Sequence, residues 1–355
     1  MDKKSFLSDY NGLEPAFERL RTTAHSMVVN ALSEARIDTL HIQSRVKNFE
    51  SAYTKYLEKG YSDPFNEITD FVALRVIVFV ENDIELASEA LRGVFEVDED
   101  NTVDKRQPPT AGMVGYRSLH IVFALGKERA KLPEYQNISN VRFEVQIRTA
   151  LQHAWAEIEH KQNYKSQFSL PTELQHRLMR ISGTLEMIDR EFSNITLEAQ
   201  KYAIEVREDP NDQTRDESIS EIALKALFER AVESAGIDKK SLRYNPDTGT
   251  SLSMKAVIEE LRVFDVLTVG QLRKLIGNLT SEDLANFQRH DVSVSLPRFY
   301  RAAMIKKDVD KFLEATKHDL IASINIDNIR ALESITGSSD LEQRFEKAGI
   351  PVVPF

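Results

Sequence analysis

The segment SRVKNFESAYTK carries three side chains that suit phosphate binding, spaced four residues apart. Lys47, Ser51 and Lys55 would share one face if this segment is helical. We expect Ser44 to cap that helix, which would place Arg45 in the first turn, where free backbone N–H groups already favour an anion. The pattern predicts a phosphate site, although a solvent-exposed helix face that carries two lysines has the same spacing.

Two acidic residues could bind a divalent cation. Asp70 stands just before an apolar stretch, and Glu144 lies in the alternating segment FEVQIR. Mg²⁺ prefers hard oxygen ligands together with substrate phosphates, so carboxylates at strand ends are ordinary ligands in phosphoryl-transfer sites. The two carboxylates could share one ion if their strands are neighbours, which the sequence does not show. Asp70 could equally serve only as a turn-forming residue.

An arginine and an aromatic residue could contact a flat ligand. Arg75 lies inside the apolar stretch FVALRVIVFV, where a guanidinium needs a partner or a planar stack. In GYRSLH, the side chains of Tyr116, Ser118 and His120 fall on one face of a strand. An aromatic ring beside hydrogen-bonding groups suits stacking on a nucleobase, but a structural tyrosine at the start of a strand gives the same pattern.

A third group of polar residues raises the question of zinc. His153, Glu157 and His160 lie within seven residues of one expected helix. Their spacing is not that of the helical zinc proteases, so we predict that they orient the helix through hydrogen bonds. Trp155 and Ile158 are expected in the core beneath them.

The composition of the chain limits the classes of protein it could be. The chain has 355 residues, no cysteine, and 46 Lys+Arg against 56 Asp+Glu, giving a net charge of −10. The absence of cysteine excludes disulfides and cysteine nucleophiles. The negative net charge disfavours binding to nucleic acid without sequence specificity. No apolar run is long enough for a membrane span, the N-terminus does not resemble a signal peptide, and there is no glycine-rich phosphate loop. The His-Asp pairs at 290–291 and 318–319 are expected at the surface.

The elements that must position these residues follow from hydrophobic periodicity. In the segment 141–148, apolar and polar residues alternate, which predicts a strand with Glu144 and Gln146 on its polar face. The predicted elements are helix over 14–57 in two or three pieces, strand 71–80, helix 83–95, strands 116–125 and 141–148, and helices from 149 and over 171–206.

The chain divides into three predicted regions. Residues 1–60 form an N-terminal helical region that contributes to the active site, and residues 61–207 form an α/β domain. A polar segment over 208–217 is the best linker, and residues 218–355 are expected to form a wholly helical domain of unknown role. Its predicted helices lie near 219–235, 252–264, 268–277, 281–290, 297–317 and 339–348.

The order of these motifs resembles the synthetase domain of the RelA/SpoT family of (p)ppGpp alarmone synthetases. The resemblance runs through RVK-x3-S-x3-K, D-x4-R, GYRSLH, FEVQIRT-x3-HAWAEIEH and a following Tyr-Lys, over about residues 40–165. It implies a nucleotidyltransferase-like fold, in which a mixed sheet is flanked by helices. It also implies a GTP/GDP pyrophosphokinase, which transfers pyrophosphate from ATP to the 3′-hydroxyl of GDP or GTP and releases AMP.

The resemblance assigns roles in the ATP half of such a site. Arg45 and Arg75 would stack on the adenine. Lys47, Ser51 and Lys55 would hold the ATP phosphates.

It also assigns roles in the metal and acceptor half. Asp70 and Glu144 would bind Mg²⁺, and Glu144 would also help to activate the acceptor hydroxyl. Tyr116 would stack on the guanine, with His120 and Gln146 as polar contacts to the acceptor.

Other interpretations remain open because the segment DKRQPPTAGMV before Tyr116 departs from the usual family pattern. One alternative is a toxin-like pyrophosphotransferase that acts on the 3′ end of tRNA or on another nucleotide, with the C-terminal domain as its regulator or antitoxin. Another is an inactive nucleotide-binding module. The resemblance further implies a bacterial, cytoplasmic protein without a membrane segment, and a possible homo-oligomer.

Overall fold

The computed structural model describes residues 1–104, 118–165, 171–208, 214–237, 250–289, 294–316 and 324–354. The chain forms two compact units, Met1–Thr196 and Leu197–Phe355. The division falls within one long helix, α7 (Thr172–Glu208).

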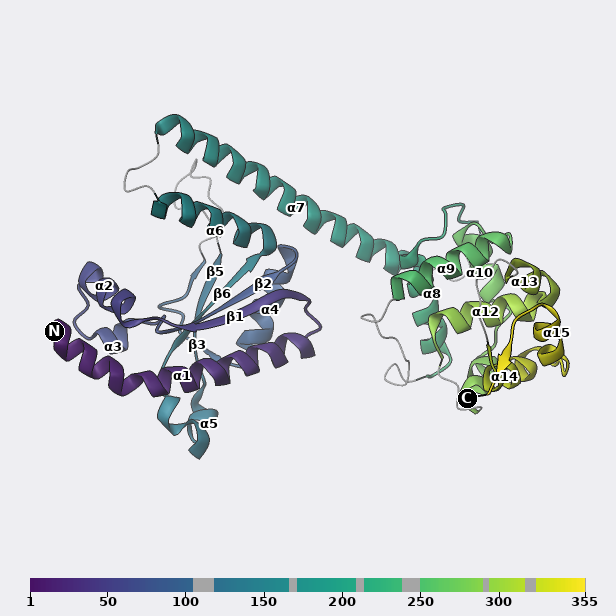
Figure 1. Ribbon diagram of the computed structural model, residues 1–355, viewed down its shortest axis with the longest axis horizontal. Helices are drawn as coiled ribbons and strands as arrows, with labels where there is room; N and C mark the ends of the chain where they lie inside the picture. Colours follow the sequence, from purple (N-terminus) through teal and green to yellow (C-terminus); the bar gives the residue numbers. More distant parts are fainter. Residues whose placement is uncertain are drawn as a thin grey trace. The chain divides into compact units, whose positions relative to one another are not determined.

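The first unit is built around a mixed sheet (Figure 1). Its strands are β1 (Thr39–Val46), β2 (Val72–Val78), β3 (Glu96–Val97), β4 (Val103–Asp104), β5 (Leu119–Ala124) and β6 (Phe143–Thr149). The order is β1-β2-β6-β5-β3, and β4 also pairs with β5. Strands β2 and β6 are parallel, whereas the other pairs are antiparallel.

The two faces of this sheet differ in polarity. The helices of the unit are α1 (Lys3–Glu34), α2 (Phe49–Lys59), α3 (Pro64–Glu67), α4 (Asn82–Arg92), α5 (Lys127–Ala130), the 3₁₀ helix η1 (Pro133–Ile138) and α6 (Ala150–Lys165). Helices α1 and α4 pack on the apolar face, and α6 lies on the opposite side (Figure 1). The predicted alternation in β6 is confirmed, since Phe143, Val145 and Ile147 are all fully buried. Their polar neighbours therefore face the side of α6.

The prediction of helix over residues 14–57, in two or three pieces, is wrong for residues 35–48, which lie between α1 and α2. Thr39–Val46 forms strand β1, paired antiparallel with β2 along its length. Ser44 consequently lies opposite Leu74 in the sheet and does not cap a helix. The helix cap is Asn48, whose side chain accepts a hydrogen bond of 2.9 Å from the backbone N–H of Ser51. Pairing with β2 supplies backbone hydrogen bonds that local sequence periodicity does not register.

The strands and helices predicted elsewhere in this unit are confirmed within a few residues. The strand over 71–80 is β2, the helix over 83–95 is α4, and the helix over 171–206 is α7. The strand predicted over 116–125 is β5, from Leu119 to Ala124; Ser118 precedes it, and Tyr116 lies outside the described residues. Two hydrogen bonds hold α7 against this unit: Thr149 Oγ1 donates to Asp189 Oδ2 at 2.6 Å, and Ser193 Oγ accepts from the backbone N–H of Glu81 at 2.9 Å.

In its described residues, the second unit is helical apart from one short pair of strands. Its helices are α8 (Glu221–Ser234), α9 (Thr250–Val263), α10 (Val269–Ile276), α11 (Ser281–Arg289), α12 (Leu296–Lys307), α13 (Val309–Thr316), α14 (Ile326–Thr336) and α15 (Leu341–Lys347). The expectation of wholly helical structure is wrong for β7 (Ile324–Asn325) and β8 (Val352–Val353), which pair in parallel. The single helix predicted over 297–317 is two helices, because Asp308 adopts an extended conformation between them.

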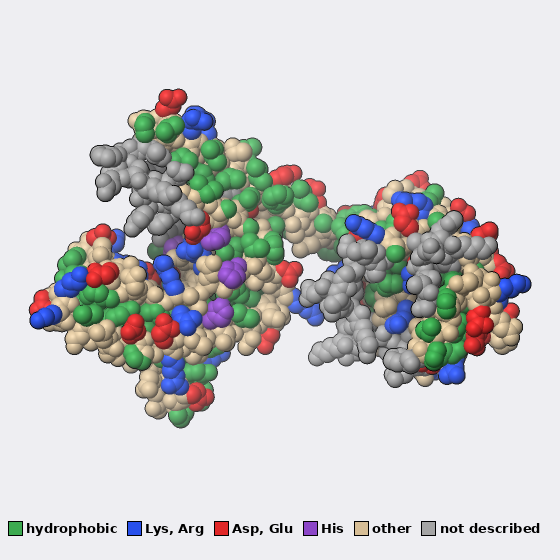
Figure 2. Space-filling model, viewed as in Figure 1, with side chains coloured by type: hydrophobic (Ala, Val, Ile, Leu, Met, Phe, Trp, Pro, Cys, Tyr) green, Lys and Arg blue, Asp and Glu red, His purple; other side chains and the backbone are tan. Residues whose placement is uncertain are grey.

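Several sequence predictions lie partly or wholly outside the described residues. Residues 209–213 of the predicted linker over 208–217 lie outside the described residues. Both His-Asp pairs, at 290–291 and 318–319, lie outside them as well. Among the described residues, none of the helices combines the length and apolar character that a membrane crossing requires. Helix α7 does carry exposed apolar side chains, including Met187, Phe192 and Ile195, and green side chains follow this helix in Figure 2.

Candidate active site

Two rows of residues cross the polar face of the sheet, because four neighbouring strands place their side chains in register. Glu144 on β6 pairs with Ala73 on β2 and with Val122 on β5. Gln146, two residues further along β6 and on the same face, pairs with Arg75 and with His120. Five of the residues singled out in the sequence therefore lie on one surface, from strands far apart in the chain: Arg45, Arg75, His120, Glu144 and Gln146.

Asp70 is held by two of the predicted phosphate-binding lysines. Its carboxylate oxygens lie 2.7 Å from Lys47 Nζ and 2.9 Å from Lys55 Nζ, and only 15% of its side chain is exposed. Lys47 follows β1 instead of lying on the helix, so its predicted helical position is wrong. Its backbone N–H bonds the carbonyl of Phe71 at 2.8 Å, which brings it beside Asp70.

The predicted convergence of Lys47, Ser51 and Lys55 is nonetheless found. Together with Asp70 they line one open pocket of about 540 Å³. Lys47 lies just after β1, and Ser51 and Lys55 lie on α2, so they come from either side of the Asn48 cap. Glu50, Glu58 and Lys59 also line it, so the pocket contains cationic side chains beside carboxylates, as is expected where phosphates and a divalent cation meet.

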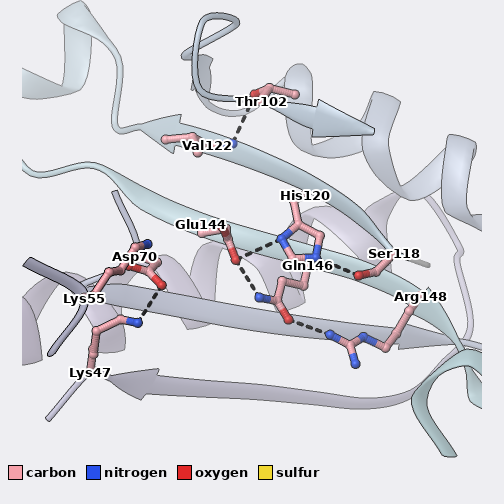
Figure 3. A network of polar contacts seen from close by, with 10 residues as sticks. All are labelled: Lys47, Lys55, Asp70, Thr102, Ser118, His120, Val122, Glu144, Gln146 and Arg148. Carbon is pink, nitrogen blue, oxygen red and sulfur yellow. Dashed lines mark hydrogen bonds and ion pairs between the residues drawn. The ribbon is translucent and has the colours of Figure 1, made fainter. Parts of the chain in front are cut away.

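Glu144 is the centre of a hydrogen-bond network on β5 and β6 (Figure 3). Its Oε1 accepts from Gln146 Nε2 at 2.5 Å and lies 3.2 Å from His120 Nδ1. The other ring nitrogen of His120 lies 2.7 Å from Ser118 Oγ, so the imidazole connects a hydroxyl to the carboxylate. These contacts fix the rotamers of Glu144 and Gln146 before any ligand is bound.

Arg148 belongs to this network although the sequence analysis gave it no role. Its Nη2 donates to Gln146 Oε1 at 2.5 Å, and only 6% of the residue is exposed. Burial, together with the nearby charge of Arg75, lowers the pKa of the Arg148 guanidinium to about 10. The sequence placed Arg148 on the polar face of the alternating strand, which could have suggested a role. A strand pattern does not show whether such a residue is buried or exposed, however.

Arg45 and Arg75 line a second pocket, of about 290 Å³, with Gln43, Ser44 and Gln146. Arg75 Nη1 forms an ion pair of 3.0 Å with Glu157 on α6, the partner that a guanidinium in a strand requires. The planar guanidinium groups and the apolar floor formed by Ala73 and Leu74 suit a flat ligand.

Helix α6 only partly matches its predicted arrangement. Trp155 is buried as expected, but Ile158 is 51% exposed and its predicted core position is wrong. Ile158 does not point at the sheet, so this helix has a narrower apolar face than the periodicity suggested. Burial and the charges of Arg75 and Arg148 lower the pKa of His153. The side chain of His160 lies outside the described residues.

Asp70 and Glu144 could share one metal ion only if their strands are neighbours, and the structure shows that they are. Strands β2 and β6 are adjacent and parallel, so Asp70, just before β2, and Glu144, at the second residue of β6, lie toward the same end of neighbouring strands. Figure 3 shows their contacts together. Among the described residues, no cluster of three His, Asp or Glu side chains could hold a metal by itself. Two carboxylates still fit Mg²⁺, which usually takes one or two of them along with water and substrate phosphates.

Comparisons with known proteins place this site in a family. The model described as "Region found in RelA / SpoT proteins" matches residues 44–169. The GTP pyrophosphokinase YwaC of Bacillus subtilis is 30% identical over 162 residues, which are 44% of this chain and 74% of that protein. The GTP pyrophosphokinase YjbM of the same organism is 32% identical over 164 residues, 45% of this chain and 73% of that protein. The chain belongs to the RelA/SpoT family.

Solved structures are similar to about half of the chain. The crystal structure of the small alarmone synthetase 1 from Bacillus subtilis has a TM-score of 0.46 at 24% identity, covering 55% of this chain and 99% of that one. The same synthetase bound to its product pppGpp has a TM-score of 0.46 at 25% identity, covering 54% of this chain and 98% of that one. The expected mixed sheet with helices on its faces is confirmed by the strand pairing described above.

Proposed function

We propose that this protein transfers pyrophosphate from ATP to the 3′-hydroxyl of GDP or GTP, producing the alarmone (p)ppGpp. The observation that carries the proposal is the meeting of two parts on adjacent parallel strands: Asp70 with its two lysines, and Glu144 with its fixed polar partners. The family match over residues 44–169 contains both parts, and two relatives are named GTP pyrophosphokinases. A bacterial, cytoplasmic setting fits these substrates.

The first half of the site binds ATP. Lys47, Ser51 and Lys55 bind the phosphates in the 540 Å³ pocket. Arg45 and Arg75 stack on the adenine in the 290 Å³ pocket lined by both guanidinium groups. Both lysines already lie near a carboxylate, so they are placed where a second anion can share their charge.

The second half binds the acceptor and promotes the reaction. The oxygen of the 3′-hydroxyl attacks the β-phosphorus of ATP, the bond from that phosphorus to the α,β-bridging oxygen breaks, and AMP leaves. Glu144 takes the hydroxyl proton, held in place by Gln146 and His120. Mg²⁺ held by Asp70 and Glu144 would neutralise charge on the transferred phosphates. Positioning and charge neutralisation supply most of such catalysis, so a covalent nucleophile is not needed.

Recognition of the guanine is assigned to residues near β5. His120 and Gln146 contact the acceptor from the polar face, next to Glu144. Tyr116, which lies outside the described residues, stacks on the guanine. Use of the tRNA 3′ end as acceptor and assembly into a homo-oligomer remain predictions.

An acceptor comparison tests the proposal. The purified full-length protein is incubated with Mg²⁺, labelled ATP, and either GDP, GTP or deacylated tRNA. A labelled guanosine nucleotide is the expected product. Labelled tRNA alone would establish the alternative acceptor, and absence of transfer to all three would contradict the proposed activity and favour an inactive nucleotide-binding module.

A further inference from the structure

Gln43 lines the 290 Å³ pocket, and no step of the proposed reaction uses it. It lies on β1, at the edge of the sheet, and it is exposed. The second glutamine of the pocket, Gln146, is occupied at both ends, because its Nε2 donates to Glu144 and its Oε1 accepts from Arg148. Among the described residues, none forms a hydrogen bond with the amide of Gln43. Gln43 therefore supplies the amide of this pocket that is available to a ligand.

The register between β1 and β2 places four side chains of the pocket at the corners of a small square. Gln43 pairs with Arg75, and Arg45 pairs with Ala73, so the two arginines lie on one diagonal. Diagonal neighbours on an antiparallel pair of strands are about 7–8 Å apart. That separation is twice the optimal contact distance between carbon atoms, which is about 3.5–4.0 Å. One flat ring therefore fits between the two guanidinium planes.

The other diagonal carries the two side chains that meet the edge of such a ring. Ala73 offers only a methyl group and is 7% exposed, so it limits the depth of the pocket without hydrogen bonding. Gln43, at the opposite corner, offers a donor and an acceptor side by side in one plane. Of these two corners, only that of Gln43 can distinguish one base from another by hydrogen bonding.

We propose that Gln43 selects adenine over other purines by hydrogen bonding to the edge of the base. Its Oε1 accepts from the N6 amino group and its Nε2 donates to N7, the pair of bonds with which glutamine recognises adenine in DNA. Guanine and hypoxanthine carry an oxygen acceptor in place of this amino group, which leaves Oε1 without a donor. The inference rests on the proposed binding of ATP in this pocket, and it names the residue that determines the choice of donor nucleotide.

Three nucleotide probes test the two hydrogen bonds separately: ATP, inosine triphosphate, which lacks the amino group, and 7-deaza-ATP, which lacks the N7 acceptor. Their binding to the full-length protein is measured by calorimetry with Mg²⁺ and without an acceptor nucleotide. ATP should bind about 5- to 150-fold more tightly than inosine triphosphate, the discrimination that a bidentate amide contact supplies. It should also bind at least about fivefold more tightly than 7-deaza-ATP, which leaves Nε2 unpaired.

Replacing the amide should remove this preference. Gln43→Leu keeps the approximate size of the side chain but removes both hydrogen-bonding groups. The variant should lose at least about fivefold in ATP affinity and bind the three nucleotides about equally well. The ratio between nucleotides is the readout, because a variant that only distorted the pocket would weaken all three together. An unchanged ratio, or equal weakening of all three, would overturn the proposal.

A second variant separates the two bonds. Gln43→Glu retains an acceptor for the N6 amino group but places a carboxylate against N7, which has no hydrogen to donate. ATP should then lose its advantage over 7-deaza-ATP, while both should still bind more tightly than inosine triphosphate. A retained preference for ATP over 7-deaza-ATP would show that Gln43 does not contact N7.

A matched control and a transfer assay complete the test. Gln136 is exposed on η1, which contacts α1 on the apolar side of the sheet, so Gln136→Leu should leave all three affinities unchanged. Selective ATP binding without a guanosine product would contradict the proposed reaction and leave the role of Gln43 standing. Transfer to GDP with an unaltered nucleotide preference in Gln43→Leu would contradict the role of Gln43 alone. Absence of ATP binding to the parent protein would overturn both.

Discussion

Asp70 and Glu144 have different neighbours, and this difference predicts how their variants behave. Asp70 contacts two lysines, whereas Glu144 contacts neutral or weakly basic groups, Gln146 and His120. Asp70→Asn and Glu144→Gln should each slow pyrophosphate transfer by about 100-fold or more, the scale seen when a group aimed at transition-state charge is removed. Steady-state transfer rates measure the loss, and circular dichroism checks that the fold survives.

A control for these variants is available on the other face of the sheet. Glu89 is an exposed residue on helix α4, away from the proposed site, so Glu89→Gln removes an equal charge there. That variant should retain nearly full activity. Substantial activity in Asp70→Asn or Glu144→Gln would remove the metal assignment.

Arg148 positions Glu144 indirectly, because it donates to Gln146, which in turn donates to Glu144. Its pKa, lowered to about 10 by burial first and by Arg75 next, means that the fold disfavours the charged form. The guanidinium is still charged near neutral pH, so its charge opposes folding there, and this cost is relieved as pH rises above about 10. Arg148→Met should therefore slow transfer about tenfold or more without lowering the unfolding temperature.

Two measurements separate a positioning role for Arg148 from a structural one. Thermal unfolding reports the stability, and the transfer rate per folded molecule reports the activity. Gln146→Leu should slow transfer to a similar degree, and the double variant should add little, because both changes release Glu144. Fully additive losses would show that Arg148 does not act through Gln146.

At the scale of elements, helix α11 depends on a buried acidic residue. Asp283 Oδ2 accepts hydrogen bonds from Lys306 Nζ at 2.6 Å and from the Thr280 backbone at 2.6 Å. Burial alone would raise the pKa of Asp283, but these hydrogen bonds outweigh burial and lower it. A lowered pKa stabilises the fold above the ordinary aspartate pKa, and this contribution disappears as pH falls through the lowered value.

Asp283→Asn should consequently destabilise the second unit by about 1–3 kcal/mol near neutral pH. The difference from the parent should shrink as pH falls below the ordinary aspartate pKa of about 4, where the unfolded chain binds a proton, and disappear as pH falls through the lowered pKa of the folded chain. Urea unfolding across this pH range measures it. Glu282→Gln, at an adjacent side chain that is 76% exposed, is the control and should change little. A constant difference at all pH values would contradict the electrostatic explanation.

The elements also show what the sequence could predict. The alternation in β6 predicted its faces correctly, because burial on one side leaves a period of two in the residues. Strand β1 was missed since Leu40 and Ile42 give only a short apolar signal, and pairing with β2 decides its structure. The polar contacts among Glu144, His120 and Gln146 required the register of β5 against β6, which no local pattern contains.

At the scale of the whole molecule, two separate cores predict two unfolding events. Phe123 is buried in the core of the first unit and Phe228 in that of the second, and the two buried clusters share no residue. Phe123→Ala and Phe228→Ala should each cost about 3–5 kcal/mol in their own unit. Differential scanning calorimetry should show two transitions, each lowered by one variant. A shift of both transitions in either variant would show that the units unfold together.

The sequence motifs identified the family over one part of this molecule and left the rest without a function. The family match ends at residue 169, and the helices of the second unit lie beyond it. The packing of these helices could not be predicted from the sequence, because their buried side chains come from segments far apart in the chain.

The central claim is that the group moved from ATP is pyrophosphate, with Glu144 essential. ATP labelled at its β-phosphate tests this directly when it is incubated with GDP, Mg²⁺ and the full-length protein. The label should appear in a guanosine nucleotide with release of unlabelled AMP, and Glu144→Gln should slow this transfer about 100-fold or more. Label that remains in ADP while GDP is unmodified would contradict the account.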